Sequence, residues 1–227
     1  MNMGNNHKGF TLIELLVAMA VGLVVMAGVS ATFRSQQKSY LLQEQVAAMQ
    51  QNLRAAMFHM EREIRMAGCD PNQTVDAQFV TANATSITFT QDLRGTTEGS
   101  HPDGDTDDPT ENITYYLNGD ELRRNDLNGI GDQVIADNIS ALNFVYLNQA
   151  GTQLDNDGAG NVTTSILQIR SVEITLVANT GRGDRGYQNT TAYTNQQGTT
   201  ILDLSANPDN LRRKLLTTCI TCRNLGL

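Results

Sequence analysis

An apolar run near the start of the chain limits what this sequence can fold into more than any other feature. The run covers residues 10–33, and its polar side chains are Thr11, Glu14, Ser30 and Thr32. As an α-helix it would be about 36 Å long, which is enough to cross the hydrocarbon core of a bilayer. A carboxylate at that depth costs about 2.5–3.5 kcal/mol on insertion scales and usually has a partner. We therefore expect a membrane helix in which Glu14 meets an opposite charge.

Two simpler interpretations compete with this one. A cleaved secretory signal peptide would use Lys8 as its charged region and Ala18-Met19-Ala20 as its small-residue cleavage site. The apolar region of a signal peptide is normally free of charge, so Glu14 argues against it. A plain single-pass anchor leaves Glu14 without a role.

The helical pattern continues beyond the apolar run. Spacings of three and four residues place seven apolar side chains on one face of a helix, namely Val46, Met49, Leu53, Met57, Met60, Ile64 and Ala67. Gly68 is suited to end this helix, and Asp70-Pro71 follows it. We predict one helix over residues 10–67, whose stripe packs on the protein's own sheet while His59 faces solvent.

After residue 71 the apolar period changes to two. Eight segments are predicted to be strands: Gln78–Ala82, Ser86–Gln91, Asn112–Leu117, Glu121–Arg124, Gln133–Ala136, Ala141–Leu147, Ile169–Val177 and Leu211–Cys222. Asn118-Gly119 predicts a tight hairpin with a primed turn. Val172, Ile174 and Leu176 alternate with polar residues, so one face of their strand should pack and the other should contact water.

Together these patterns predict an α+β fold. A long N-terminal α-helix packs on an antiparallel β-sheet head, with a membrane half at residues 10–33 and an amphipathic half at residues 34–68. The β-rich globular head covers residues 69–227.

Composition limits the function of this chain. The net charge is −8, and binding to a phosphate backbone requires clustered Lys and Arg, so no nucleic-acid partner is expected. Three His residues leave little material for acid–base or metal chemistry.

Residues 98–111 contain six carboxylates in fourteen positions. Asp103, Asp105 and Asp107 alternate, and this spacing can direct oxygen atoms at one hard cation such as Ca²⁺. A complete EF-hand signature does not follow, and a solvated acidic loop is the competing interpretation. Residues 155–158 (Asp-Asn-Asp-Gly) are a weaker candidate for a cation site, and their sequence is more typical of a turn. Apart from Ca²⁺, no cofactor is expected.

The chain has three cysteines, so at least one of them is not paired within the chain. In an extended strand Cys219 and Cys222 would lie about 10 Å apart, beyond the limit of about 7 Å for a disulfide. We therefore expect Cys69 to pair with one of these two and to fasten the last strand to the end of the helix.

Gly9-Phe10-Thr11-Leu12-Ile13-Glu14 resembles the prepilin leader of type IV pilins and type II secretion pseudopilins. The resemblance implies that residues 1–9 are a leader and that a dedicated membrane peptidase cuts between Gly9 and Phe10. The same enzyme methylates the new N-terminus of Phe10. Glu14 is then implied to pair with the amine of a neighbouring subunit during assembly.

Strings in the second half are similar to those of PilW-like minor pilins, among them residues 113–117, 122–125 and 136–144. The implied function is that of a minor structural subunit, and not of an enzyme, which is incorporated into a type IV pilus or primes its assembly. A minor pseudopilin of a type II secretion system is the alternative. A third hypothesis, from another class, is a membrane-tethered periplasmic binding module that never polymerises.

The resemblance also implies partners and a location. The partners are the prepilin peptidase and N-methyltransferase, other pilin subunits with the pilus assembly machinery, and the bacterial inner membrane. The head would be periplasmic, and it would reach the cell surface after assembly.

Overall fold

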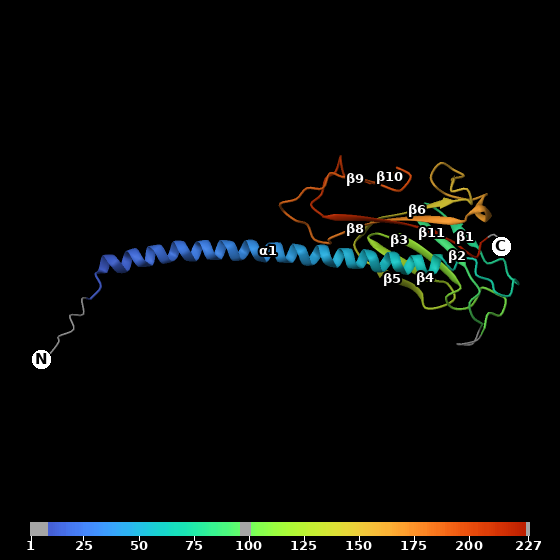
Figure 1. The fold of residues 1–227 in the computed structure, drawn as a ribbon, viewed down its shortest axis with the longest axis horizontal. Helices are drawn as coiled ribbons and strands as arrows, with labels where there is room; N and C mark the ends of the chain where they lie inside the picture. Colours follow the sequence, from blue (N-terminus) through green and yellow to red (C-terminus); the bar gives the residue numbers. More distant parts are fainter. Residues whose placement is uncertain (1–8, 96–100, 226–227) are drawn as a thin grey trace. The chain divides into compact units, whose positions relative to one another are not determined.

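The computed structural model describes residues 9–95 and 101–225 of the chain. The N-terminal part consists of one long helix, α1 (Leu12–Ile64), and the rest is built from antiparallel strands (Figure 1). The chain forms two compact units, residues 1–44 and residues 45–227, so that α1 contributes to both. The predicted α+β class, with one long apolar helix and antiparallel sheets, is confirmed.

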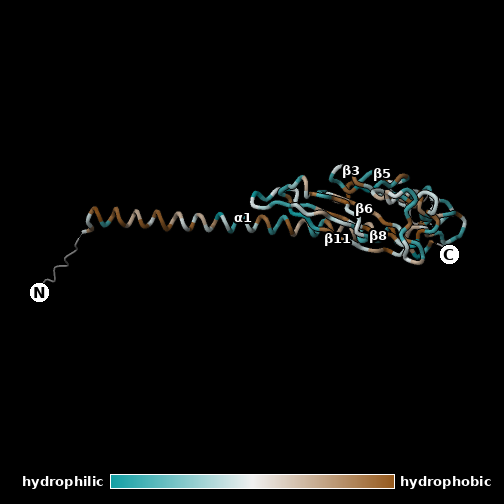
Figure 2. Tube along the Cα trace, turned by 90° about the horizontal axis from the view of Figure 1, so that it is seen from above, coloured by the Kyte–Doolittle hydropathy of each residue, from teal (hydrophilic) through white to brown (hydrophobic). Residues whose placement is uncertain are grey.

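The first unit presents its apolar side chains to the outside. Every residue from 9 to 41 is exposed, and Figure 2 shows the predominantly hydrophobic colouring of this part of α1. By length and composition, α1 is apolar enough to cross a membrane. A helix that is apolar on all sides is either buried in a core or in lipid. No side chain of the described residues covers the apolar part of α1 before Arg34, so its surface is free to contact lipid or other helices.

The C-terminal end of α1 tightens before the chain turns. Arg65 still donates to the Glu61 carbonyl four residues back, but Met66 donates to Glu63, only three residues back. Gly68 then adopts φ +77°, and a Cβ there would lie 2.3 Å from the Leu225 side chain. The stop at Gly68 is confirmed, although the regular helix ends at Ile64, three residues before the predicted end.

Two larger sheets form the head. The first has five strands in the order β1-β2-β3-β4-β5: β1 (Phe79–Ala82), β2 (Ser86–Thr90), β3 (Asn112–Asn118), β4 (Glu121–Asp126) and β5 (Gly131–Ala136). The second has the order β11-β8-β6-β7: β6 (Ile139–Leu147), β7 (Gln153–Leu154), β8 (Ser171–Asn179) and β11 (Arg213–Thr221). A short 3₁₀ helix, η1 (Ile166–Gln168), precedes β8, and β9 (Ala192–Thr194) pairs with β10 (Thr200–Asp203).

The helix stripe and both larger sheets share one hydrophobic core. Six of the seven predicted stripe residues are buried in it, and Val46 packs against it while partly exposed. On the sheets, Phe79 lies edge-on to both Phe89 and Tyr146, with ring centroids 6.3 and 6.4 Å apart. Packing of the stripe on the protein's own sheets is therefore confirmed.

β8 differs from its prediction, because both of its faces are buried. Glu173 and Thr175, which should have contacted water, are 9% and 1% exposed. The segment after β9 accounts for this: Gln197 Nε2 donates to Glu173 Oε2 at 2.8 Å, and Asn195 Nδ2 donates to Asn143 Oδ1 on neighbouring β6 at 2.9 Å. A polar layer covers the face that the alternation assigned to solvent.

The predicted hairpin is formed, one residue later than expected. Asn118 and Glu121 are the last paired residues of β3 and β4, so the two-residue loop is Gly119-Asp120. Gly119 has φ +63°, as the first loop position of a type II′ turn requires. The primed turn is therefore confirmed.

Candidate functional site

Glu14 closes a capping box at the start of α1. The Thr11 N–H and the Thr11 Oγ1 hydroxyl each donate to Glu14 Oε2 at 2.8 Å, and the Glu14 N–H donates to Thr11 Oγ1 at 3.3 Å. These reciprocal bonds satisfy backbone donors that have no partner within the helix. The Thr-x-x-Glu spacing is readable in the sequence, but the interpretation of Glu14 as an isolated charge overlooked it.

The predicted cleavage point lies in front of this cap. Gly9 and Phe10 precede the helix, and Phe10 is 91% exposed. Exposed chain outside regular structure is the kind of backbone that a protease can bind. Residues 1–8 of the predicted leader lie outside the described residues.

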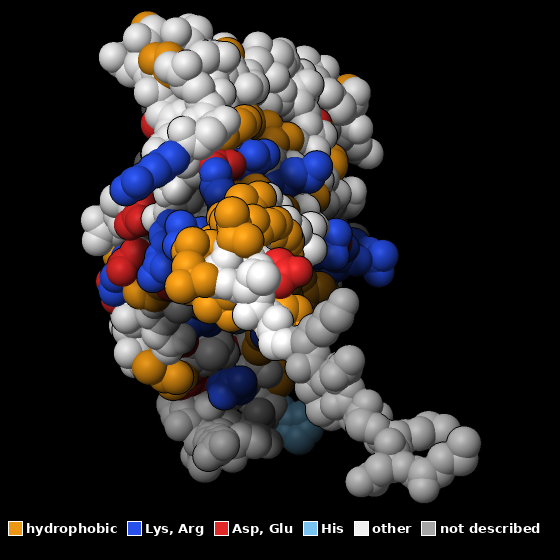
Figure 3. Space-filling model, turned by 90° about the vertical axis from the view of Figure 1, so that its left-hand side faces the viewer, with side chains coloured by type: hydrophobic (Ala, Val, Ile, Leu, Met, Phe, Trp, Pro, Cys, Tyr) orange, Lys and Arg blue, Asp and Glu red, His pale blue; other side chains and the backbone are white. Residues whose placement is uncertain are grey.

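Apolar side chains surround Glu14 on the helix surface. Figure 3 shows hydrophobic side chains clustered on the end of α1 that faces the viewer, with one acidic group among them. Leu12, Ile13 and Val17 are 77%, 69% and 57% exposed. A carboxylate in such a surface is tolerated in lipid only with a partner, and a neighbouring helix can supply one.

The acidic stretch forms a second candidate site in the connection between β2 and β3. Three carboxylates come together here, those of Asp103, Asp105 and Asp108. One oxygen atom of each lies within 4.8 Å of one oxygen atom of each of the other two. Asp107, predicted as the third ligand, is exposed, and its N–H donates to Asp105 Oδ1 at 3.2 Å. Asp108 takes the third place, because the turn at 105–107 carries the next residue inward. Glu98 lies outside the described residues.

Asp92, which follows β2, also faces this cluster and was missed in the sequence. Its Oδ2 accepts the N–H of Gly104, between two members of the cluster, at 3.1 Å. Burial, followed by the nearby carboxylates of Asp70, Asp103 and Asp105, raises the pKa of Asp92. Nothing in the local sequence signals Asp92, because only the fold brings it to the loop.

The three cysteines are free thiols in the structure. The predicted disulfide from Cys69 to Cys219 or Cys222 is not formed. Cys222 is buried, and its Sγ donates to the Ile64 carbonyl at 3.6 Å, while Cys219 points outward from β11. Burial raises the pKa of Cys222 to about 12. The last strand is thus fastened to the end of α1 by a thiol–carbonyl contact.

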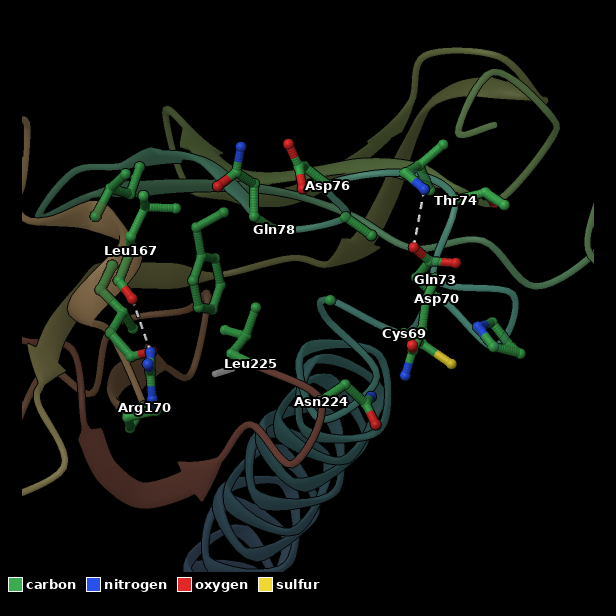
Figure 4. Close-up of a pocket in the computed structure, with 17 residues that line it drawn as sticks. Cys69, Asp70, Gln73, Thr74, Asp76, Gln78, Leu167, Arg170, Asn224 and Leu225 are labelled. Atoms are coloured by element: carbon green, nitrogen blue, oxygen red, sulfur yellow. Dashed lines mark hydrogen bonds between the residues drawn. The ribbon is translucent and has the colours of Figure 1, made fainter. Parts of the chain in front are cut away.

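A pocket lies beside the end of α1. Its volume is about 1020 Å³, and it is lined by residues 68–71, 73–79, 166–167, 169–170 and 224–225 (Figure 4). Burial and the carboxylates of Asp92 and Asp70 raise the pKa of the Cys69 thiol, whereas reactive thiols have a lowered pKa. The Arg170 guanidinium donates to the carbonyls of Leu167 and Ile169. Neither side chain is arranged for nucleophilic chemistry.

A polar cluster joins α1 to the first sheet, and it corrects the prediction for His59. His59 Nδ1 is 2.7 Å from the Tyr115 hydroxyl, which donates to Glu63 Oε2 at 2.5 Å. Arg124 Nε donates to the same carboxylate oxygen at 2.9 Å, and Arg124 Nη1 lies 3.4 Å from Asp126 Oδ2. His59 is thus only partly exposed and is hydrogen-bonded within the head.

Comparisons with known proteins agree with these features. The family model described as the prokaryotic N-terminal methylation motif matches residues 4–30. No match was found among curated proteins. Among solved structures, a type IV-like pilin from Thermus thermophilus is similar with a TM-score of 0.53 and 17% sequence identity. The similarity covers 79% of this chain and 100% of that pilin.

At this identity the structural similarity establishes the fold alone, while the motif establishes the N-terminal signal. The motif and the apolar helix suggest membrane anchoring of the chain. The chain carries the prokaryotic N-terminal methylation motif and has the fold of a type IV-like pilin.

Proposed function

We propose that this chain is a minor type IV pilin-like subunit that is incorporated into a pilus or primes its assembly. Prepilin peptidase removes residues 1–9 and methylates Phe10. Before assembly α1 spans the inner membrane once and the head is periplasmic. Afterwards the subunit lies in a filament with other pilins. The motif at residues 4–30 and the pilin fold support this proposal.

One observation carries the proposal: an apolar helix surface with no cover from its own chain holds a single carboxylate near the cleavage point. The exposed side chains of residues 10–33 require lipid or other helices around them. Cleavage creates a new amine at Phe10, four residues before Glu14. An amine of this kind on a neighbouring subunit is the opposite charge that a carboxylate in lipid requires.

The capping box is compatible with this pairing. Both hydrogen bonds from Thr11 end on the same oxygen, Oε2. Carboxylates have about four lone-pair sites on two oxygens, so Oε1 can accept a further donor. Glu14 can therefore cap its own helix and bind a neighbour's amine at the same time.

The N-terminus of the protein purified from its own membranes tests the processing. Mass spectrometry should find N-methyl-Phe10 as the first residue. An intact Met1 would contradict the proposal and favour a membrane-tethered binding module that never polymerises.

Assembly is tested separately with Glu14→Val. The variant should be cut and should keep a folded head, because Glu14 is exposed and far in sequence from the core residues of the head. Its amount in sheared filaments should fall at least tenfold relative to the wild type, a change worth about 1.4 kcal/mol in subunit association. Wild-type incorporation would remove this account of Glu14.

The same motif serves pseudopilins, so a type II secretion system remains the alternative. Deletion of the gene should reduce surface filaments and leave secretion of folded exoproteins unchanged. Loss of secretion with normal filaments would assign the subunit to the secretion system.

A further inference from the structure

We propose that Asp103, Asp105 and Asp108 bind one divalent cation of the Ca²⁺ type, with Asp92 completing the acidic wall of the site. The site would lie in the connection between β2 and β3 of the head. It is independent of filament assembly, since it involves no residue of the N-terminal segment.

The separation of the three carboxylates fits a single shared ion. Their nearest oxygen atoms lie within 4.8 Å of one another. Oxygen ligands of Ca²⁺ lie about 2.3–2.6 Å from the ion, so two of them can be at most about 5 Å apart. Three carboxylates held this close without a cation would repel one another.

Two buried carboxylate oxygens in this region have no hydrogen-bond partner. Asp108 is 5% exposed and its Oδ2 is unpartnered, and Asp92 is 0% exposed with Oδ1 unpartnered. Burial of a charged group without a partner is costly, and coordination of a metal ion is one of the few ways to offset that cost. Asp108 belongs to the triad, and the other oxygen of Asp92, Oδ2, accepts the N–H of Gly104 between two triad members, so both carboxylates border the proposed site.

The backbone around the three ligands is held in place from both sides. Asn72 Nδ2 donates to the Pro102 carbonyl at 2.8 Å, and Asn128 Nδ2 donates to the Thr106 carbonyl at 3.2 Å. The Thr110 N–H donates to both oxygens of the Asp126 carboxylate, at 3.0 and 3.1 Å. Because the loop is already ordered, ion binding does not have to supply the entropy cost of closing it.

The ligand chemistry favours Ca²⁺ over other cations. All the ligands in the triad are oxygen atoms, which suits Ca²⁺ and Mg²⁺ and not Zn²⁺, for which nitrogen and sulfur are common ligands. Asp103 is exposed and Asp105 partly so, which leaves one side open for the waters that complete a coordination of six to eight. Mg²⁺ demands a stricter octahedron at about 2.0–2.1 Å and usually keeps several waters, binding through one or two carboxylates, so a site with three carboxylates suits Ca²⁺ better.

Arg94 is the competing cation near this site. The pKa of Asp108 is raised by burial and by the carboxylates of Asp103 and Asp105, and the charge of Arg94 only partly opposes this. One guanidinium cannot neutralise the four carboxylates of the triad and Asp92. The site therefore keeps a net negative charge that attracts a divalent cation.

The proposal is tested on the full-length chain in detergent micelles after removal of metal with a chelator. Equilibrium dialysis with ⁴⁵Ca²⁺ should find one ion per chain. The melting temperature, followed by the near-ultraviolet circular dichroism of the buried tyrosines, should rise by about 5–10 °C at a hundredfold excess of Ca²⁺ over its Kd. Equal shifts with Mg²⁺ or with Na⁺ at matched ionic strength would show charge screening only and would overturn the proposal.

Two exposed residues of the loop provide a matched pair of variants. Asp103→Asn and Asp107→Asn remove the same charge from exposed positions of one loop, so neither should disturb the fold. Asp103→Asn should weaken Ca²⁺ binding at least tenfold, and Asp107→Asn should change it less than threefold. Asp108→Asn should abolish Ca²⁺ binding. Its near-ultraviolet spectrum should match that of the wild type, which shows that the fold is intact.

Equal losses in the exposed pair would mean that the ion responds to general negative charge. A loss in Asp107→Asn alone would restore the alternating triad predicted from the sequence and contradict the site proposed here. Stoichiometric binding that survives in Asp103→Asn, Asp107→Asn and Asp108→Asn would place the ion elsewhere.

Discussion

At the scale of the residue, Glu14 caps α1 and, in the proposed assembly, also pairs with a neighbour's amine; a substitution can separate these two roles. Glutamine at this position of a capping box still accepts hydrogen bonds but has no charge. We expect Glu14→Gln to keep the start of α1 and to reduce incorporation into filaments at least tenfold, because the uncharged amide cannot pair with an amine. Quantification of the subunit in sheared filaments, relative to the membrane pool, measures this effect.

Thr11→Val is the matched control for that prediction. It removes the hydroxyl that Glu14 binds and keeps the carboxylate and the shape of the side chain. The helix should lose about 1 kcal/mol of capping, and incorporation should change little. If Thr11→Val fails to assemble and Glu14→Gln assembles normally, Glu14 acts as a cap and not as an intersubunit charge.

His59 makes the stability of the head depend on pH. Burial is the main cause that lowers the pKa of His59; Arg124 and Arg62 act in the same direction, and Glu63 opposes them. The unfolded chain, with a His pKa of about 6.5, then binds more protons than the folded one. The contribution of neutral His59 is therefore complete above pH about 6.5 and is lost as the pH falls through the lower folded pKa. Tyr115, which contacts the ring, stays protonated because burial and Glu63 raise its pKa.

His59→Gln isolates this effect from the titration of carboxylates. The difference in free energy of unfolding between wild type and variant should shrink between pH 7 and pH 5, measured by urea denaturation of the full chain. A difference that stays constant or grows over this range would contradict a lowered pKa.

At the scale of the element, β4 places two adjacent arginines on opposite faces. Arg124 is 5% exposed and pairs with Glu63 of α1, whereas Arg123 pairs with the partly exposed Glu121 and Asp132. Arg124→Met should lower the free energy of unfolding by about 3–5 kcal/mol, because it leaves the partly buried Glu63 and the buried Asp126 without their cation.

Arg123→Met is the control for the buried pair. Surface ion pairs contribute about 0–1 kcal/mol, so this variant should unfold almost as the wild type does. Chemical denaturation, followed by circular dichroism, measures the free energy of unfolding of both variants. Similar losses in the two variants would mean that Arg124 contributes no more than a surface charge.

The sequence predicted elements with a strong period and missed those without one. The stripe from Val46 to Ala67 and eight alternating segments were long enough to be recognised, and their boundaries differ from the structure by up to three residues at the ends. β7, β9 and β10 have only two to four residues, which is too few for a period to be visible. Their absence from the prediction also explains the error in β8, since the segment after β9 covers its polar face.

The candidate sites also divide into those that a local sequence pattern predicts and those that depend on the fold. The cleavage motif and Glu14 are contiguous in sequence, so local reasoning could find them, and their roles remain predictions. The acidic site depends on contacts that the fold creates. Asp92 approaches Gly104 across a loop, and Asp108 replaces Asp107 because of one local turn. The alternation of carboxylates along a loop could predict neither the contact of Asp92 nor the place of Asp108.

At the scale of the whole molecule, the chain consists of two units with different requirements. Residues 9–41 are exposed throughout, whereas the buried core begins at Met49 and is built by residues of the second unit alone. The apolar surface of the first unit thus has no cover from its own described residues, whereas the second unit has its own hydrophobic core. This division predicts that the head folds without the membrane segment.

A chain of residues 35–227 tests this prediction. It lacks the apolar run and keeps every buried residue of the core, so it should be soluble without detergent. Its free energy of unfolding should equal that of the full chain within about 0.5 kcal/mol, the range of changes made away from a core. Urea denaturation, with the near-ultraviolet signal of Tyr115 and Tyr146 as the probe, compares the two. An unfolded or aggregated fragment would show that the membrane segment stabilises the head, and that the two units are not independent.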